Sequence, residues 1–102
     1  MQIQEFYVYV LKSLRNQKRY VGSTRISPQE RLKQHNYGCN QWTKENRPFE
    51  LIYHEEYQTM TEARKREIFL KSGIGRKFLN QILVQKIESS ASAKGGSASG
   101  GG

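Results

Sequence analysis

Two strand patterns joined by a short polar turn occupy residues 7–22. In the first pattern, Tyr7, Tyr9 and Leu11 alternate with apolar residues, so these three share one face of a strand. The turn is polar and contains Asn16, a residue that tolerates turn geometry. The chain then returns in a second run of strand-forming residues. The stretch therefore predicts an antiparallel hairpin.

Two tyrosines of this hairpin, Tyr9 and Tyr20, fall on adjacent strands. Gly22 follows Tyr20 at two residues, and a glycine lets a ligand approach the backbone closely because it has no Cβ atom. In an antiparallel pair the two phenols can face the same side. Taken alone, these segments are ordinary strand sequence. Whether their tyrosines and glycine belong to a functional site depends on the rest of the chain.

A helix is predicted to begin after Ser27. Ser27 and Glu30 have the spacing of a capping box, and Pro28 falls at the first helical position. The helix should end near Gly38, with Leu32 pointing toward the sheet. Arg31 and His35 are four residues apart and therefore share a face. They are either two solvated residues or part of a site.

Residues 39–48 are predicted to form a loop in which Trp42 lies between the cations Lys44 and Arg47. The indole can stack on a base or a sugar, or it can pack over the edge of the sheet. Residues 49–57 predict a third strand because they are rich in β-formers and are bounded by a proline. Within that strand, we expect His54 and Glu55 to face solvent without a role.

A second helix is predicted from about Thr59 to Lys71. At 100° per residue its apolar stripe contains Met60, Ala63 and Leu70, and Glu67 falls inside the stripe. A carboxylate on the buried side is costly unless it is paired or bound to a metal. Glu67 is therefore either a metal ligand or half of an ion pair with Arg31 or Lys71.

Gly73 is predicted to cap this helix in the left-handed conformation, and a last helix should follow over about residues 76–86. Residues 89–102 contain only Ser, Ala, Gly and one Lys. Such a segment has no apolar surface to offset its ordering entropy. We therefore expect one small domain over residues 1–88 and a flexible tail, or an appended linker, over residues 89–102.

Composition narrows the classes of function. The net charge is +8 and all nine acidic residues are glutamates, which removes the usual ligands of aspartate-based nucleases, aspartic proteases and EF-hands. The excess of positive charge favours a polyanionic partner, although a surface rich in lysine is also common. Cys39 is the only cysteine, so an intramolecular disulfide is excluded. No signal peptide or long apolar run occurs, and a cytoplasmic protein without a membrane partner is expected.

The motifs together resemble the GIY-YIG nuclease superfamily. The two motif halves read Tyr7-Val8-Tyr9 and Tyr20-Val21-Gly22, and Arg31, His35 and Glu67 follow in the family's order. The resemblance spans Phe6 to about Leu83, and residues 71–79 are similar to small stand-alone bacterial members. One departure is Tyr7, which stands where the family has glycine. The resemblance implies a three-stranded antiparallel sheet flanked by helices, an α/β (α+β) fold, with the site on one face.

The family's chemistry is metal-dependent hydrolysis of a phosphodiester bond. By resemblance, Glu67 would hold one divalent cation, Mg²⁺ or Mn²⁺, and Arg31 would contact the phosphate. Either Tyr9 or Tyr20 would take the proton from the attacking water, and His35 would position the water or a phosphate. The expected substrate contacts come from Gly22, Lys44, Arg47, Arg76 and Asn80, the last a loose match to a family asparagine.

Three hypotheses follow from these residues. The first is an endonuclease acting on nucleic acid, with DNA favoured over RNA. The second is a nucleic-acid-binding module on the same fold without cleavage, and the third is a small basic interaction protein. Repair intermediates, branched DNA and mobile-element targets are all open as substrates, and a protein partner could supply specificity.

Overall fold

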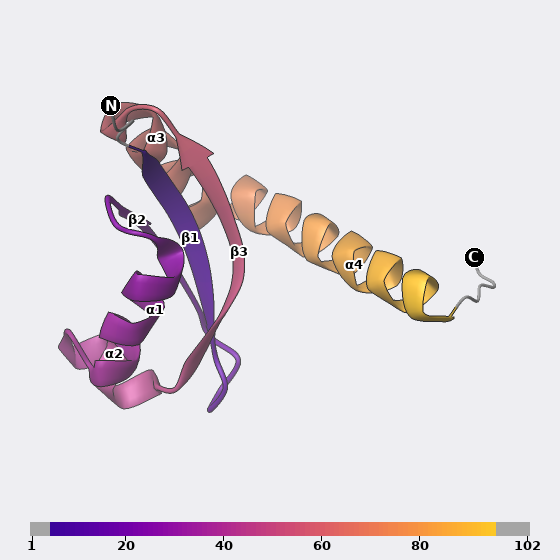
Figure 1. Ribbon diagram of the computed structural model, residues 1–102, viewed down its shortest axis with the longest axis horizontal. Coiled ribbons are helices and arrows are strands. Elements are labelled where there is room, and N and C mark those ends of the chain that lie inside the picture. The colour runs from indigo at the N-terminus through magenta and orange to yellow at the C-terminus, as the bar shows by residue number, and fades with distance from the viewer. Residues whose placement is uncertain (1–4, 96–102) are drawn as a thin grey trace.

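The computed structural model describes the backbone of residues 5–95 and the side chains of residues 5–84. Its core is a three-stranded antiparallel sheet flanked by helices, as predicted (Figure 1). The elements follow in the order β1 (Phe6–Ser13), β2 (Arg19–Thr24), α1 (Pro28–Tyr37), α2 (Gln41–Asn46), β3 (Phe49–Tyr57), α3 (Met60–Lys71) and α4 (Gly73–Gly95).

Strand β1 lies in the middle of the sheet, whose order is β2-β1-β3. Because successive side chains of a strand point to opposite faces, β1 contributes to two cores. Val8 and Val10 are fully buried on one face, while Tyr9 and Leu11 are buried on the other. Within residues 5–95, β2 pairs with β1 alone, so its other edge carries no strand.

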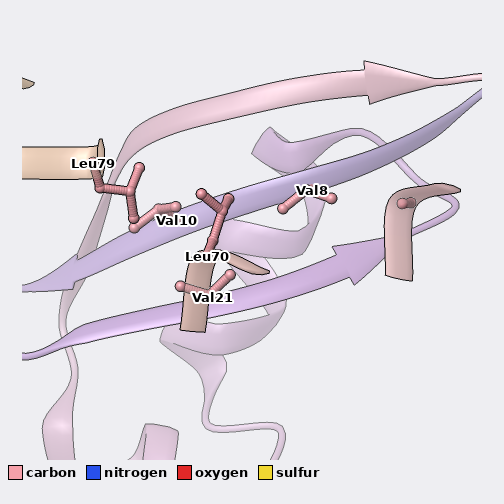
Figure 2. Close-up of a cluster of buried hydrophobic side chains, with 6 residues drawn as sticks. Val8, Val10, Val21, Leu70 and Leu79 are labelled. Atoms are coloured by element: carbon pink, nitrogen blue, oxygen red, sulfur yellow. The ribbon is translucent and has the colours of Figure 1, made fainter. Parts of the chain in front are cut away.

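Each face of the sheet is covered by its own pair of helices. Figure 2 shows Val8, Val10 and Val21 of the sheet facing Leu70 of α3 and Leu79 of α4. On the opposite face, Leu32 of α1 and Trp42 of α2 pack against the cluster of buried residues formed by Tyr9, Leu11 and Phe49. The molecule is thus a sheet between two helical layers, and we refer to its faces as the α1/α2 face and the α3/α4 face.

The helix boundaries of α1 and α3 follow from local chemistry. The Ser27 side chain accepts a hydrogen bond from the Glu30 amide at the start of α1, and Thr59 does the same for Glu62 at the start of α3. Gly38 ends α1 in the left-handed conformation with φ of 87°. These ends agree with the sequence-based predictions.

Two predictions about the chain between helices were wrong. Residues 39–48 are not all loop, because Asn40 and Thr43 form a capping box that starts the short helix α2. Gly73 is not a left-handed cap but the first residue of α4. A Cβ atom at Gly75 would lie 1.9 Å from the Phe69 carbonyl oxygen, so glycine at this position allows α4 to cross close to the end of α3.

Helix α4 also extends beyond its predicted end near Lys86. It continues to Gly95, so the backbone of residues 89–95, expected in a flexible tail, is helical. Adding a residue to an anchored helix is far easier than starting a helix, and serine and alanine tolerate the extension. Residues 96–102 of the expected tail lie outside the described part of the chain. In Figure 1, α4 leaves the sheet and projects away from it.

Glu55 of β3 has a structural role that the sequence did not indicate. Its carboxylate accepts two hydrogen bonds from Arg66 of α3, at 2.9 and 3.1 Å, and further bonds from the hydroxyls of Tyr53 and Tyr57. Burial by itself raises the pKa of Glu55, but these hydrogen bonds outweigh it and the net pKa lies below the ordinary value of 4.5. Glu55 therefore joins β3 to α3, while His54 is exposed as predicted.

Candidate active site at the edge strand

The two motif halves meet at a close contact between Tyr9 and Gly22. These residues are direct partners across β1 and β2. A Cβ atom at Gly22 would lie 2.6 Å from the Tyr9 hydroxyl oxygen and 3.0 Å from a ring carbon of Tyr20. Glycine is therefore needed here to make room for the two tyrosine rings, and not to admit a ligand to the backbone.

Tyr9 forms a buried hydrogen bond with His35. Its hydroxyl oxygen lies 2.8 Å from the Nε2 atom of His35, and the two residues are only 1% and 0% exposed. Helix α1 places His35 over the sheet one turn after Arg31, as the spacing predicted. The other ring nitrogen, Nδ1, lies 3.5 Å from the Sγ atom of Cys39. His35 is thus engaged on both sides and does not face solvent.

The charge states of this pair follow from burial. Burial, together with the neighbouring Tyr20, raises the pKa of Tyr9 well above its ordinary value of 10.0, although the charge of Arg31 opposes the shift. Burial and the charge of Arg31 lower the pKa of His35 from 6.5 to about 4. At neutral pH, Tyr9 is a phenol and His35 is an uncharged imidazole.

Tyr20 occupies a different environment on the same α1/α2 face. Its ring centroid lies 6.1 Å from that of Tyr9, 4.7 Å from that of His35 and 5.5 Å from that of Trp42. Unlike Tyr9, Tyr20 is half-buried and lines a cavity. Of the two motif tyrosines, Tyr20 is the one that a ligand can reach.

Arg31 completes this group from the outer side. It is half-exposed on α1, close enough to Tyr9 and His35 to influence the pKa of both. Its guanidinium donates a hydrogen bond to the side chain of Gln34. The structure therefore brings together four residues singled out in the sequence, namely Tyr9, Tyr20, Arg31 and His35.

Glu67 lies on the α3/α4 face instead. One carboxylate oxygen accepts a hydrogen bond from Ser23 of β2 at 2.7 Å, and the other pairs with the Lys71 ammonium at 2.8 Å. Ser23 follows Gly22 directly, so its side chain points to the opposite face from the tyrosines. The residues expected to form a site on one face of the sheet are therefore divided between the two faces, because Glu67 approaches β2 from the α3/α4 face.

Glu67 is held as a half-buried anion. Its side chain is 19% exposed, whereas that of Lys71 is 54% exposed. Burial raises the pKa of Glu67, but the hydrogen bonds from Lys71 and Ser23 outweigh it and the net pKa lies below 4.5. The predicted alternative of an ion pair is present with Lys71, whose i+4 spacing from Glu67 was the available signal. Ser23 was missed, because its pairing spans two elements far apart in the sequence.

A cavity of about 790 Å³ follows the free edge of β2 and connects the two faces. Tyr20 and Trp42 line it from the α1/α2 face, and Leu70 and Lys71 line it from α3. We call this cavity the β2-edge groove. Because Lys71 contacts Glu67, the groove passes between the accessible tyrosine and the neighbourhood of the carboxylate.

The expected substrate-binding residues fall in different places. Arg76 lines the β2-edge groove. Lys44 and Asn80 are exposed on α2 and α4, outside the groove lining. Arg47 donates a hydrogen bond to the Tyr37 carbonyl oxygen at 3.1 Å, so its guanidinium is used to cap the end of α1.

Trp42 adopts the packed arrangement and not a free stacking platform. Its ring stacks on that of Phe49 at a centroid distance of 5.6 Å and an interplanar angle of 22°. A second contact joins Trp42 to Tyr20 at a centroid distance of 5.5 Å, so the indole already has two aromatic neighbours. The alternative in which Trp42 packs over the edge of the sheet is confirmed.

The donor set near Glu67 is compatible with one hard cation. Among the described residues, no group of three or more His, Cys or Glu side chains converges on one point. Mg²⁺ keeps several waters and is often bound by one or two carboxylates together with substrate phosphates. A single ionised carboxylate whose ammonium partner is exposed fits that mode. It does not fit a cage made only of protein ligands.

The chain was compared with models of protein families, with individual proteins and with solved structures. The model of the GIY-YIG catalytic domain matches residues 5–80. A UPF0213 protein of Listeria welshimeri is 33% identical over 87 residues, which cover 84% of this chain and 93% of the relative. A UPF0213 protein of Clostridium perfringens is 36% identical over 66 residues, covering 64% of this chain and 69% of the relative. No solved structure matches the chain.

A membrane-spanning helix is absent from the described part of the chain, where no helix combines the necessary length and apolar character.

Proposed function

The chain belongs to the GIY-YIG family of nucleases, and on that premise we propose that it is a metal-dependent endonuclease that hydrolyses phosphodiester bonds of DNA. The observation that carries the proposal is the position of Tyr20. Its phenol stands between the buried pair of Tyr9 and His35 and the β2-edge groove, where a substrate can reach it.

Tyr20 is assigned as the general base. Two neighbouring phenols cannot both ionise readily, because the second charge is repelled by the first. Burial disfavours the phenolate of Tyr9, so the proton of the attacking water goes to the phenolate oxygen of Tyr20. The guanidinium of Arg31 supplies positive charge on this side and offers a fork of donors to the phosphate oxygens.

Tyr9 and His35 are assigned positioning roles. His35 has no exposed surface, which argues against its direct contact with a water or a phosphate. Its hydrogen bond instead fixes the ring of Tyr9, and Tyr9 packs against Tyr20 and fills the space above Gly22. The pair holds the tyrosine ring of the base in one orientation, which matters because small displacements of a catalytic group are costly.

Glu67 is assigned as the residue that would hold one divalent cation, Mg²⁺ or Mn²⁺. When bound, the cation would supply positive charge and Lewis acidity to the phosphate and the leaving oxygen. Glu67 provides the carboxylate, Ser23 orients it through one oxygen, and Lys71 neutralises it in the free protein. A cytoplasmic location is part of the same proposal.

The test is nicking of supercoiled plasmid with Mg²⁺ or Mn²⁺ and with EDTA. Glu67→Gln should abolish metal-dependent nicking while changing the free energy of unfolding by less than about 1 kcal/mol, because the Lys71 partner is 54% exposed and the amide oxygen of the variant can still accept the hydrogen bond from Ser23. Glu62→Gln, an exposed glutamate on the same helix, is the matched control and should retain activity. Full nicking by the Glu67 variant would remove its assigned role. A shift of the plasmid without any nicking would favour a binding module, and neither effect would favour an interaction protein.

A further inference from the structure

The position and lining of the β2-edge groove indicate what kind of ligand the proposed active site accepts. The groove runs beside a strand edge that no described residue covers by pairing, and it begins at the turn before β2. Tyr20, the assigned base, lies in its wall. Whatever occupies the groove therefore lies directly next to the reacting phosphate. The inference that follows rests on the proposed function.

The rim of the groove is cationic. Four positively charged residues converge on it from the turn, β2, α3 and α4, namely Lys18, Arg19, Lys71 and Arg76. All four are exposed, and the described residues that line the groove include no carboxylate. Lys71 is paired with Glu67, so Lys18, Arg19 and Arg76 supply the positive charge that is not already used by that pair. Such a single-sign rim suits a chain of phosphates, each of which needs a neutralising cation.

The floor of the groove is apolar. Val21, Leu70 and Leu79 form its base, and Tyr20 and Trp42 form one wall. Surfaces of this kind suit the faces of sugars and bases without reading the hydrogen-bonding pattern of a particular base. The rings of Tyr20 and Trp42 already pack against each other, with their centroids 5.5 Å apart. A base would therefore lie against their exposed parts and not between them.

The size of the groove favours one nucleic-acid strand over two. A volume of about 790 Å³ is that of a pocket for a small ligand. A B-form duplex is far larger, since its major groove alone is about 12 Å wide. We propose that the β2-edge groove binds a few nucleotides of one unpaired strand beside the scissile phosphate. The substrate of this site thus presents a single-stranded segment to Tyr20.

The proposal can be tested without catalysis. Binding of a short labelled oligothymidylate is measured by fluorescence anisotropy in EDTA over a range of salt concentrations, beside an oligouridylate and a DNA hairpin duplex whose loop is a non-nucleotide linker. We expect the single strand to bind at least about ten-fold more tightly than the hairpin, or 1.4 kcal/mol. Comparison of the oligouridylate with the oligothymidylate shows whether RNA or DNA binds more tightly.

Two variants with equal loss of charge separate the groove from the general surface. Lys18→Gln/Arg76→Gln removes two groove cations and should reduce the slope of log K against log salt by about 1.4, which is 0.7 for each phosphate contact on a single strand. Lys33→Gln/Lys65→Gln removes two exposed cations that do not line the groove. It should leave the slope close to that of the wild type.

Several results would overturn the groove as a single-strand site. The first is equal or tighter binding of the hairpin, and the second is an equal slope of log K against log salt for the two double variants. The third is no binding of any polynucleotide, as expected if the edge of β2 accepts a peptide strand. Failure of the proposed nuclease function looks different. In that case the single strand would bind in EDTA as described, but Mg²⁺ or Mn²⁺ would produce no cleavage.

Discussion

Replacing His35 tests how strongly the buried tyrosine–histidine pair is coupled to stability. The pKa of His35 is lowered from 6.5 to about 4, first because the imidazole is buried and second because Arg31 is close. In the unfolded chain the imidazole takes up a proton as the pH falls below 6.5, whereas in the folded chain it stays neutral until about pH 4. Stability should therefore be complete above pH 6.5 and decrease as the pH falls toward 4.

The magnitude follows from proton linkage. One pKa unit corresponds to about 1.4 kcal/mol, so the shift predicts that His35 lowers the free energy of unfolding by about 3 kcal/mol between pH 7 and pH 4. Glu55 and Glu67 act in the same direction at low pH, since their pKa values are lowered in the folded state. A comparison that leaves these glutamates unchanged is therefore needed.

His35→Gln provides that comparison because an amide can still hydrogen-bond the Tyr9 hydroxyl but does not titrate. Urea unfolding of both proteins at pH 7 and pH 4 gives the loss of stability for each, and the difference between the two losses isolates His35. We expect the wild type to lose about 3 kcal/mol more than the variant. Parallel losses would mean that His35 titrates normally, and that it is not held neutral inside the fold.

Two further substitutions test packing around the site. Gly22→Ala places a methyl group 2.6 Å from the Tyr9 hydroxyl, and should cost about 1–3 kcal/mol in urea unfolding because the buried ring has little room to move. Arg66→Met removes the two hydrogen bonds to Glu55 and should cost about 2 kcal/mol by the same measurement, since it leaves a half-buried carboxylate without its cation.

Each of these has a control within the chain. Gly73→Ala adds the same methyl group where no atom lies within 4 Å, and should be neutral or stabilising by up to about 1 kcal/mol. Lys12→Met breaks an exposed pair with an N–O distance of 3.7 Å and should cost less than about 1 kcal/mol. A cost at Gly22 equal to that at Gly73, or at Arg66 equal to that at Lys12, would contradict the packing assigned to these positions.

Residue patterns were sufficient to predict the hairpin and its tyrosines. Alternation along β1 is a local property, and cross-strand pairing then places Tyr9 and Tyr20 on one face without further information. The structural reason why position 22 needs a glycine was not predictable in the same way. Its close contact with the Tyr9 ring depends on a rotamer that His35 holds from another element.

The sequence could not predict on which face of the sheet Glu67 lies. A helical stripe shows which residues face the sheet but not which face of the sheet the helix covers. Helix α3 packs on the face of Val8 and Val10, so Glu67 meets β2 through Ser23 and not beside the tyrosines. The burial of His35 was likewise missed, because a histidine on a mostly polar helix reads as a solvated residue.

The most direct test of the account is the single-turnover cleavage rate of Tyr20→Phe and Tyr9→Phe as a function of pH. Phenylalanine keeps each ring but removes its hydroxyl, and circular dichroism verifies that both variants are folded. Tyr20→Phe should lose about 10²–10⁴-fold in rate, together with the rise in rate with pH that deprotonation of the base produces in the wild type. Tyr9→Phe should lose only about ten-fold and should keep that rise, since its hydroxyl serves to position the base. Loss of the pH-dependent rise in Tyr9→Phe alone, or near-normal rates in both variants, would contradict the assignment of Tyr20 as the general base.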